Sequence, residues 1–134
     1  MNEMVEKLVE LRIASRHACS IGGRGNYVTL KVKALYLLSK EPLSPPDLMD
    51  KLCMVKSNLA PLCNSLVKDG LIEKLRGKND RRSITYRITE KGRAKLAGVE
   101  KSLESKFNGI ADNEEDIEKT LTIFNNMLDL LSFV

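Results

Sequence analysis

Apolar residues recur at intervals of three and four along most of the chain, a spacing typical of amphipathic helices. A first helix is expected over residues 3–19, followed by a glycine-rich connector, IGGRGNY, that lacks the spacing of a phosphate-binding loop. Thr29 can cap a second helix. The apolar stripe of the first helix consists of Met4, Leu8, Leu11 and Ala18, and the inner face of the second of Leu30, Ala34, Leu35 and Leu38.

Two further helices follow at short range. Ser44 is a good N-cap and two prolines follow it, so a short third helix is expected to begin there and to end near Leu52. After a tight turn at Cys53-Met54-Val55, a fourth helix is expected to run to Asp69, where Gly70 stops it. Its inner face would consist of Leu59, Leu62, Cys63 and Leu66.

The chain then changes to the alternating pattern of β-strands. Strands are expected over residues 71–76 and 83–88, joined by turn residues at 77–80. Ile84, Tyr86 and Ile88 would share one face of the second strand. The expected product is a short and strongly basic β-hairpin.

Two long helices complete the pattern. Thr89 can cap a fifth helix, and the capping-box spacing of Asp112 and Glu115 predicts the start of a sixth. The expected fold class is therefore mainly α with a small β-hairpin (α+β). Because two helices joined by a three-residue turn precede a basic hairpin, the architecture is that of a winged helix-turn-helix. The apolar positions of the last two helices are Leu96, Val99, Leu103, Phe107, Ile117, Leu121, Phe124, Leu128 and Leu131.

The length of 134 residues suits one domain, and the net charge of +4 hides an asymmetry. Residues 111–134 hold six acidic residues and one basic residue, whereas residues 74–95 hold nine basic and two acidic ones. No apolar run approaches the roughly 18 residues that cross a bilayer. The acidic, amphipathic N-terminal segment does not resemble a signal peptide, so a cytoplasmic protein is expected.

The basic hairpin beside a helix pair favours DNA as the partner. The second helix of such a pair fits a major groove, and the hairpin can reach phosphates or the minor groove, whose negative potential attracts arginine. A solvated charged surface is the simpler alternative.

The central part of the chain, about residues 43–96, resembles the multiple-antibiotic-resistance regulator (MarR) family. The resemblance lies in PLSPPDLMDKL, in SNLAPLCNSLVKDGLIEK, and in NDRRS followed by ITEKGR. Its most specific element is the D-x-R of Asp80 and Arg82, followed closely by Thr89 to Gly92. The flanking helices match the family in pattern only.

The resemblance implies a transcription regulator that acts as a homodimer on pseudo-palindromic promoter sites, and a repressor is the expected type. Many members of the family release DNA when a small phenolic or aromatic ligand binds or when a cysteine is oxidised. The single domain 1–134 would comprise a DNA-binding part, 29–96, and dimerisation helices, 1–20 and 97–134. The expected dimerisation residues are Met4, Leu8, Leu11, Ile117, Leu121, Phe124, Leu128 and Leu131.

The candidate DNA-binding residues come from the fourth helix and the hairpin. Asn58 and Asn64 suit adenine edges, while the serines and Lys68 suit phosphates. The resemblance places Arg82 in the minor groove, and Asp80 could pair with its guanidinium. The helix set is Ser57, Asn58, Pro61, Asn64, Ser65 and Lys68, and the hairpin set is Arg76, Lys78, Asp80, Arg81, Arg82 and Arg87.

Pro61 conflicts with a helix that starts near Val55, as the family pattern implies, because proline in a helix interior costs about 3 kcal/mol. With Asn58 as the cap, Pro61 would be the third helical residue, where its missing N–H has no intrahelical partner. The sequence therefore predicts a helix that starts late or is kinked about Ser57. Pro61 could then touch a thymine methyl.

Three cysteines without a CxxC motif are expected to be reduced thiols, and burial as small hydrophobes is the default for each. Cys19, near His17 and Arg16, is a candidate redox sensor. The spacing of Cys19, Cys53, Cys63 and His17 fits no zinc pattern, so no metal or other cofactor is expected.

Two alternatives to a ligand-responsive repressor remain open: a winged-helix module that binds protein or RNA, and a cysteine-based redox regulator. An enzyme is not expected. The single histidine has no nucleophile and base to work with, and no phosphate-binding or metal motif is present.

Overall fold

The computed structural model describes residues 3–20, 28–80, 82–107 and 113–132, without the side chains of residues 12, 14–20, 106 and 107. The chain divides into two units, Met1–Ala97 and Gly98–Val134. In chain order the elements are α1 (Glu3–Ser20), α2 (Leu30–Lys40), α3 (Pro45–Leu52), α4 (Lys56–Lys68), β1 (Ile72–Arg76), β2 (Ile84–Ile88), α5 (Glu90–Phe107) and α6 (Glu114–Ser132).

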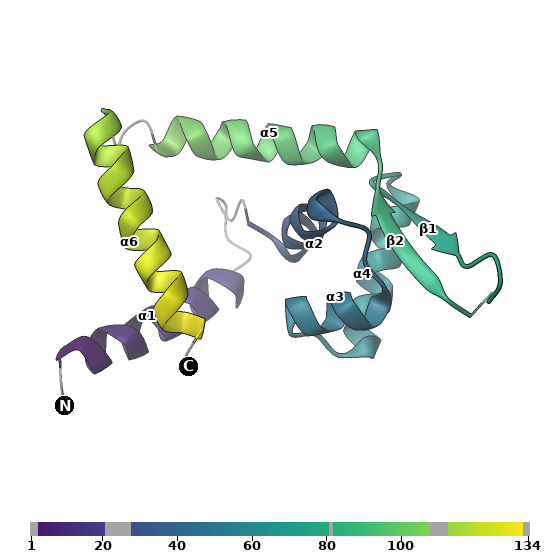
Figure 1. Cartoon of the computed structure of the whole chain (residues 1–134), viewed down its shortest axis with the longest axis horizontal. Helices are drawn as coiled ribbons and strands as arrows, with labels where there is room; N and C mark the ends of the chain where they lie inside the picture. Colours follow the sequence, from purple (N-terminus) through teal and green to yellow (C-terminus); the bar gives the residue numbers. More distant parts are fainter. Residues whose placement is uncertain (1–2, 21–27, 81, 108–112, 133–134) are drawn as a thin grey trace. The chain divides into compact units, whose positions relative to one another are not determined.

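The described segments thus form a mainly helical fold with one antiparallel hairpin, which confirms the expected fold class (Figure 1). The hairpin register pairs Ile72 with Ile88 and Arg76 with Ile84. Leu43, just before α3, forms two backbone hydrogen bonds of 2.8 and 3.1 Å with Tyr86. It lies along the edge of β2 opposite to the edge that pairs with β1. These bonds tie the helix pair to the hairpin.

A single core lies among α2, α3, α4 and the hairpin. Its apolar positions are largely those predicted, but Leu30 is exposed because it occupies the first turn of α2, outside the core. In the part of the chain described, no charged residue is buried, and the hydroxyl of Tyr86 and the thiol of Cys63 are the polar side-chain groups of this core. The core residues are Ala34, Leu35, Leu38, Leu43, Leu48, Leu59, Cys63, Leu66, Leu71, Ile72, Tyr86 and Ile88.

Three predicted caps are confirmed by side-chain hydrogen bonds. Thr29 Oγ1 accepts from the Val32 N–H at 3.3 Å, and Ser44 Oγ accepts from the Asp47 N–H at 3.3 Å. Each satisfies a donor that the first helical turn leaves without a partner. The third cap, Thr89, starts α5 and has a second role.

Thr89 joins α5 to the end of α4. Its hydroxyl accepts from the Gly92 N–H at 3.1 Å and donates to the Gly70 carbonyl at 2.6 Å. Gly92 packs so closely that an added Cβ would lie 2.1 Å from the Leu71 carbonyl oxygen. The threonine and glycine of the T-E-K-G motif therefore fix the start of α5 against the segment that precedes β1.

The predicted cap of the sixth helix is wrong by one residue. Asn113, rather than Asp112, caps α6: its Oδ1 accepts from the Asp116 N–H at 2.9 Å. Asn and Asp are equally good caps, so adjacent candidates cannot be separated by propensity. Asp112 itself lies outside the described residues.

Candidate nucleic-acid interface

Helix α4 begins earlier than the predicted cap, Asn58, implied. Val55 is its N-cap, without a side-chain cap bond, and its carbonyl accepts from the N–H groups of Asn58 and Leu59, both at 3.0 Å. Asn58 is therefore not the cap. The helix runs through Ser57 and Pro61 without a break, which makes Pro61 the sixth helical residue rather than the third.

The turn before α4 explains this start. Cys53 adopts a left-handed conformation, with φ of 53°, and the Met54 N–H donates to the Met49 carbonyl at 2.9 Å. These contacts end α3 tightly and leave Val55 extended. A helix that starts at Lys56 then buries Leu59 in its first turn, so packing outweighs both the absent cap and the proline.

The two sides of α4 differ sharply. Leu59, Cys63 and Leu66 are buried in the core. The predicted DNA-facing residues share the other side, where all are exposed except the half-buried Ser65. The structure thus brings Ser57, Asn58, Pro61, Asn64, Ser65 and Lys68 together on one accessible surface.

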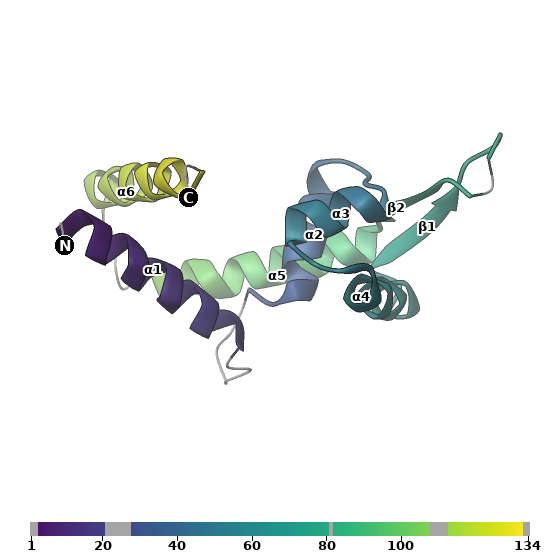
Figure 2. The same cartoon turned by 90° about the horizontal axis from the view of Figure 1, so that it is seen from below.

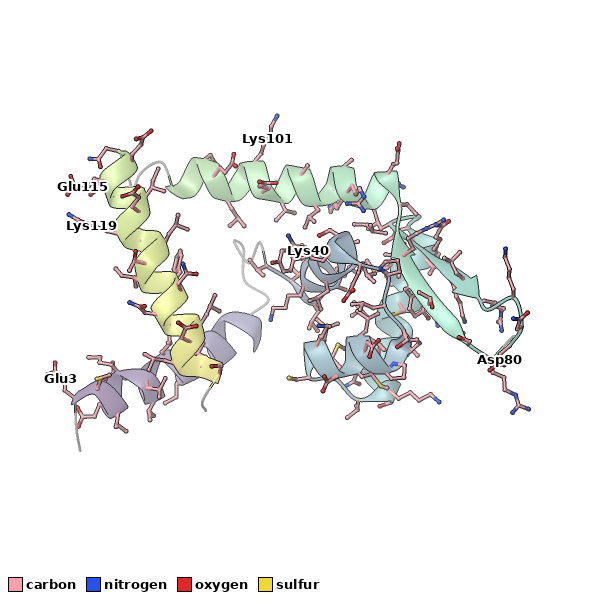
Figure 3. All side chains as sticks on the ribbon, viewed as in Figure 1. Glu3, Lys40, Asp80, Lys101, Glu115 and Lys119 are labelled. Carbon is pink, nitrogen blue, oxygen red and sulfur yellow. The ribbon has the colours of Figure 1, made fainter. Side chains whose placement is uncertain are left out.

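The tip of the hairpin is a compact turn. The Gly77 N–H donates to the Ser83 carbonyl at 2.9 Å, and the Ser83 N–H donates to the Asp80 carbonyl at 3.0 Å. A Cβ on Gly77 would lie 2.7 Å from the Asp80 carbonyl oxygen, so this position requires glycine. Figure 3 shows Asp80 at the far end of the hairpin, away from the helices of the core.

Asp80 contacts Arg82 differently from the prediction. The carboxylate Oδ1 accepts from the backbone N–H of Arg82 at 2.9 Å, so Asp80 binds the main chain of Arg82 and not its guanidinium. Aspartate commonly closes turns in this way. The Arg82 side chain is exposed, and Arg81 lies outside the described residues.

Arg87 is less available than its position in the sequence suggests. It pairs across the hairpin with Glu73, and its Nε donates to Glu73 Oε1 at 2.6 Å. An exposed pair of this kind adds under about 1 kcal/mol to stability. It does balance the charge that was expected to meet a phosphate. Lys78 is exposed, like Arg76.

Sequence reasoning missed Lys74, which lies opposite Tyr86 in the hairpin. Burial raises the pKa of the Cys63 thiol, and the Tyr86 hydrogen bond and the charge of Lys74 only partly oppose this rise. Burial also raises the pKa of Tyr86, as does its interaction with Cys63. The groups beneath Lys74 are therefore neutral near pH 7. The alternation of β1 could have revealed Lys74 only with the strand register known.

A cavity of about 450 Å³ lies beside the start of α2 and α5. Lys31 Nζ is 3.7 Å from Asp69 Oδ2, and Lys91 Nζ donates to the Asp69 carbonyl at 2.9 Å. Lysines and apolar side chains together give the cavity an amphipathic, cationic wall. It is lined by Thr29, Lys31, Val32, Leu35, Asp69, Leu71, Lys91 and Lys95.

The cysteines divide into different environments. Cys63 is buried as expected, but Cys53 is exposed, because it occupies the turn between α3 and α4. The side chain of Cys19 lies outside the described residues. No cluster of potential metal ligands occurs within the described segments. Likewise, none of the described helices is long and apolar enough to cross a membrane.

Comparisons with known proteins agree with this geometry. The family described as transcriptional regulator SarA/Rot matches residues 31–99, which is about half of the chain. The HTH-type transcriptional repressor YetL of Bacillus subtilis (strain 168) is 28% identical over 96 residues, covering 69% of this chain. The chain spans 58% of the length of that relative.

Solved structures show the same fold. The transcriptional regulator BldR from Sulfolobus solfataricus has a TM-score of 0.65 and 24% identity, covering 96% of this chain and 99% of its own. Streptococcus pneumoniae FabT, solved in complex with DNA, has a TM-score of 0.62 and 21% identity, and the match covers 98% of this chain and 94% of the FabT chain. These neighbours confirm the winged-helix fold. The chain therefore belongs to the SarA/Rot family of MarR-like winged-helix transcriptional regulators, which are not enzymes.

Proposed function

We propose that this protein is a homodimeric repressor that places α4 in the major groove of a pseudo-palindromic promoter site and the hairpin arginine Arg82 in the adjacent minor groove. The observation that carries the proposal is the two-sided character of α4: one side is locked in the core, and the other gathers small and polar side chains. A basic hairpin follows directly. A DNA-bound regulator of this kind would work in the cytoplasm.

Within this arrangement some residues of α4 would contact base edges and others would contact phosphates. The amides of Asn58 and Asn64 can each donate to and accept from an adenine edge, while Ser57, Ser65 and Lys68 suit phosphates. Pro61 offers an apolar contact to a thymine methyl. The described DNA-facing side of α4 holds no arginine, so guanine readout from this helix would be weak.

A competition experiment tests the proposed DNA binding. Fluorescence anisotropy with a labelled duplex from the region upstream of the protein's own gene is expected to show binding that survives a large excess of random duplex. Its affinity should fall with salt by about 0.9 logarithmic units per neutralised phosphate for each tenfold rise in salt. If random and upstream duplexes compete equally, the protein is not a specific regulator of that promoter.

The exposed apolar side of α6 supports dimerisation. Ile117, Leu121, Phe124 and Leu128 follow a four-three-four spacing, and each is between 44% and 64% exposed. Leu131 is half-buried, and no described residue of α6 is fully buried. On α1, Met4 is exposed, whereas Leu8 and Leu11 are half-buried. An apolar stripe of this length is stabilised when a second copy covers it, and two-fold symmetry then yields two DNA half-sites.

The cavity beside α2 and α5 supports a ligand response. Lys91 and Lys95 offer positive charge, Lys31 is paired with Asp69, and Val32, Leu35 and Leu71 offer apolar surface. This combination suits a small aromatic acid. Titration with benzoate or salicylate is expected to raise the melting temperature of the wild type and to affect a Lys95→Gln variant less. Equal responses of both proteins would exclude this cavity as the ligand site.

A further inference from the structure

The two faces of the hairpin have different surroundings. The register pairs Lys74 with Tyr86 and, one step along, Glu73 with Arg87. Because side chains on neighbouring positions of a strand point to opposite faces, these two pairs lie on opposite sides of the hairpin. Tyr86 is buried and its side chain is hydrogen-bonded to Cys63 of α4. Lys74 therefore extends from the side of the hairpin that packs against the recognition helix.

The hairpin and the recognition helix are direct neighbours. Helix α4 packs against β1, and Figure 2 shows β1 beginning next to α4. Lys74 is close enough to the helix for its charge to act on the thiol of Cys63, yet it is exposed to solvent. Its ammonium group can thus extend along the border between α4 and β1.

The charge of Lys74 is not balanced by its described neighbours. Glu73, the adjacent acid in the sequence, is engaged with Arg87 on the other face of the hairpin. Within the described part of the chain, no ion pair joins Lys74 to a carboxylate. Cys63 and Tyr86 are neutral. The border between the helix and the hairpin therefore carries an uncompensated positive charge at this point.

We propose that Lys74 binds a backbone phosphate of the DNA at the border between α4 and β1, and that the Glu73–Arg87 pair stabilises the hairpin instead of contacting DNA. This inference rests on the proposed function. A major groove is about 12 Å wide and is lined by phosphates on both sides, so a helix lying in it brings its flanks close to them. A lysine at the flank of the helix meets those phosphates, whereas an arginine on the far face does not.

A simpler role for Lys74 is protection of an edge strand. In the described part of the chain, β1 pairs only with β2, and lysine on an edge strand discourages pairing with other chains. The two roles differ in what a substitution changes. Loss of a phosphate contact alters the salt dependence of DNA binding, whereas loss of edge protection alters aggregation alone.

The test measures the DNA affinity of the wild type and of three variants: Lys74→Gln, Lys74→Arg and the matched control Arg87→Gln. Each protein is titrated with a random duplex and with upstream DNA. The salt concentration is varied between roughly 50 and 200 mM, a range over which counterion release changes affinity strongly. Lys74→Gln is expected to reduce the slope of log affinity against log salt by about 0.9. It should weaken binding to both duplexes by the same factor, because phosphates carry no sequence information. Lys74→Arg should restore the slope, and Arg87→Gln should keep it while lowering the melting temperature.

Each result decides between the possibilities. A Lys74→Gln variant with wild-type slope and affinity overturns the inference, whether or not it aggregates. So does a slope change in Arg87→Gln without one in Lys74→Gln. The random duplex measures the phosphate contact independently of any operator. Failure of the wild type to prefer upstream DNA would therefore overturn the proposed regulator function and leave the Lys74 measurement interpretable.

Discussion

The apolar residues of the winged part and those of the last helix differ in their exposure to solvent. In the winged part they meet in one core, so that Leu66 is fully buried. On α6 an equally regular stripe stays open, and Leu128 is 64% exposed. Both stripes look alike in the sequence, because each follows helical spacing. The apolar residues of the winged part serve the fold of one chain, and the stripe on α6 is the surface at which we propose that a second copy binds.

The largest effect is expected from removing a core side chain. Leu66→Ala should lower the free energy of unfolding by about 2–5 kcal/mol, because it leaves a cavity at a fully buried position. The matched variant Leu128→Ala should change the unfolding of the isolated chain by under about 0.5 kcal/mol, yet it should weaken self-association. Urea denaturation at several protein concentrations, with sedimentation to measure association, separates the two effects. Similar losses of stability that do not depend on concentration would break the comparison.

A gain of stability is expected at Pro61. Replacing it with alanine restores a backbone donor to the Ser57 carbonyl and removes a clash with the preceding turn. The unfolding free energy should rise by up to about 3 kcal/mol, the cost of proline in a helix interior. Urea titration checks this value. A destabilised Pro61→Ala variant would show that the proline belongs to the packing of α4 and not to its exposed face.

Arg82 should affect binding without affecting the fold. Because the Arg82 side chain is exposed, Arg82→Ala should change the melting temperature little. Loss of the minor-groove contact should weaken DNA binding by about 1–3 kcal/mol. Anisotropy titration measures the loss, and calorimetry checks the fold. Equal affinity of variant and wild type would remove Arg82 from the interface.

The smallest effect concerns the turn that holds Arg82. Asn has a side-chain oxygen that can accept the Arg82 N–H in the same way, so Asp80→Asn should keep wild-type affinity once the change in charge is allowed for. Asp80→Ala should lose about 1 kcal/mol of binding, the net value of a typical hydrogen bond. If Asn behaves like Ala, the carboxylate charge acts on the guanidinium as first expected, and the main-chain contact is not what matters.

Features set by neighbours in the sequence were predictable, and features set by packing were not. The caps Thr29, Ser44 and Thr89 act within three residues, and each was predicted correctly. The start of α4 depends on how α3 ends and on the burial of Leu59, which outweigh the local preference for Asn58 as a cap.

The candidate interface shows the same division. The stripe on α4 follows from helical spacing, so its six residues were found together. Arg87 and Glu73 are fourteen residues apart in the chain, and only the hairpin register brings them together. Composition alone therefore made Arg87 look available to contact a phosphate. The same register is needed to place Lys74 beside α4, which explains why it was missed.

The most direct test of the account is a hydroxyl-radical footprint on the duplex upstream of the protein's own gene. A dimer that reads DNA through α4 and the hairpin should protect two symmetric half-sites whose centres lie about 10 base pairs, or one helical turn, apart, or a multiple of that spacing. Minor-groove protection by Arg82 should flank each half-site. A single asymmetric patch of protection, or none, would contradict the proposal that two copies of this winged helix bind one promoter site.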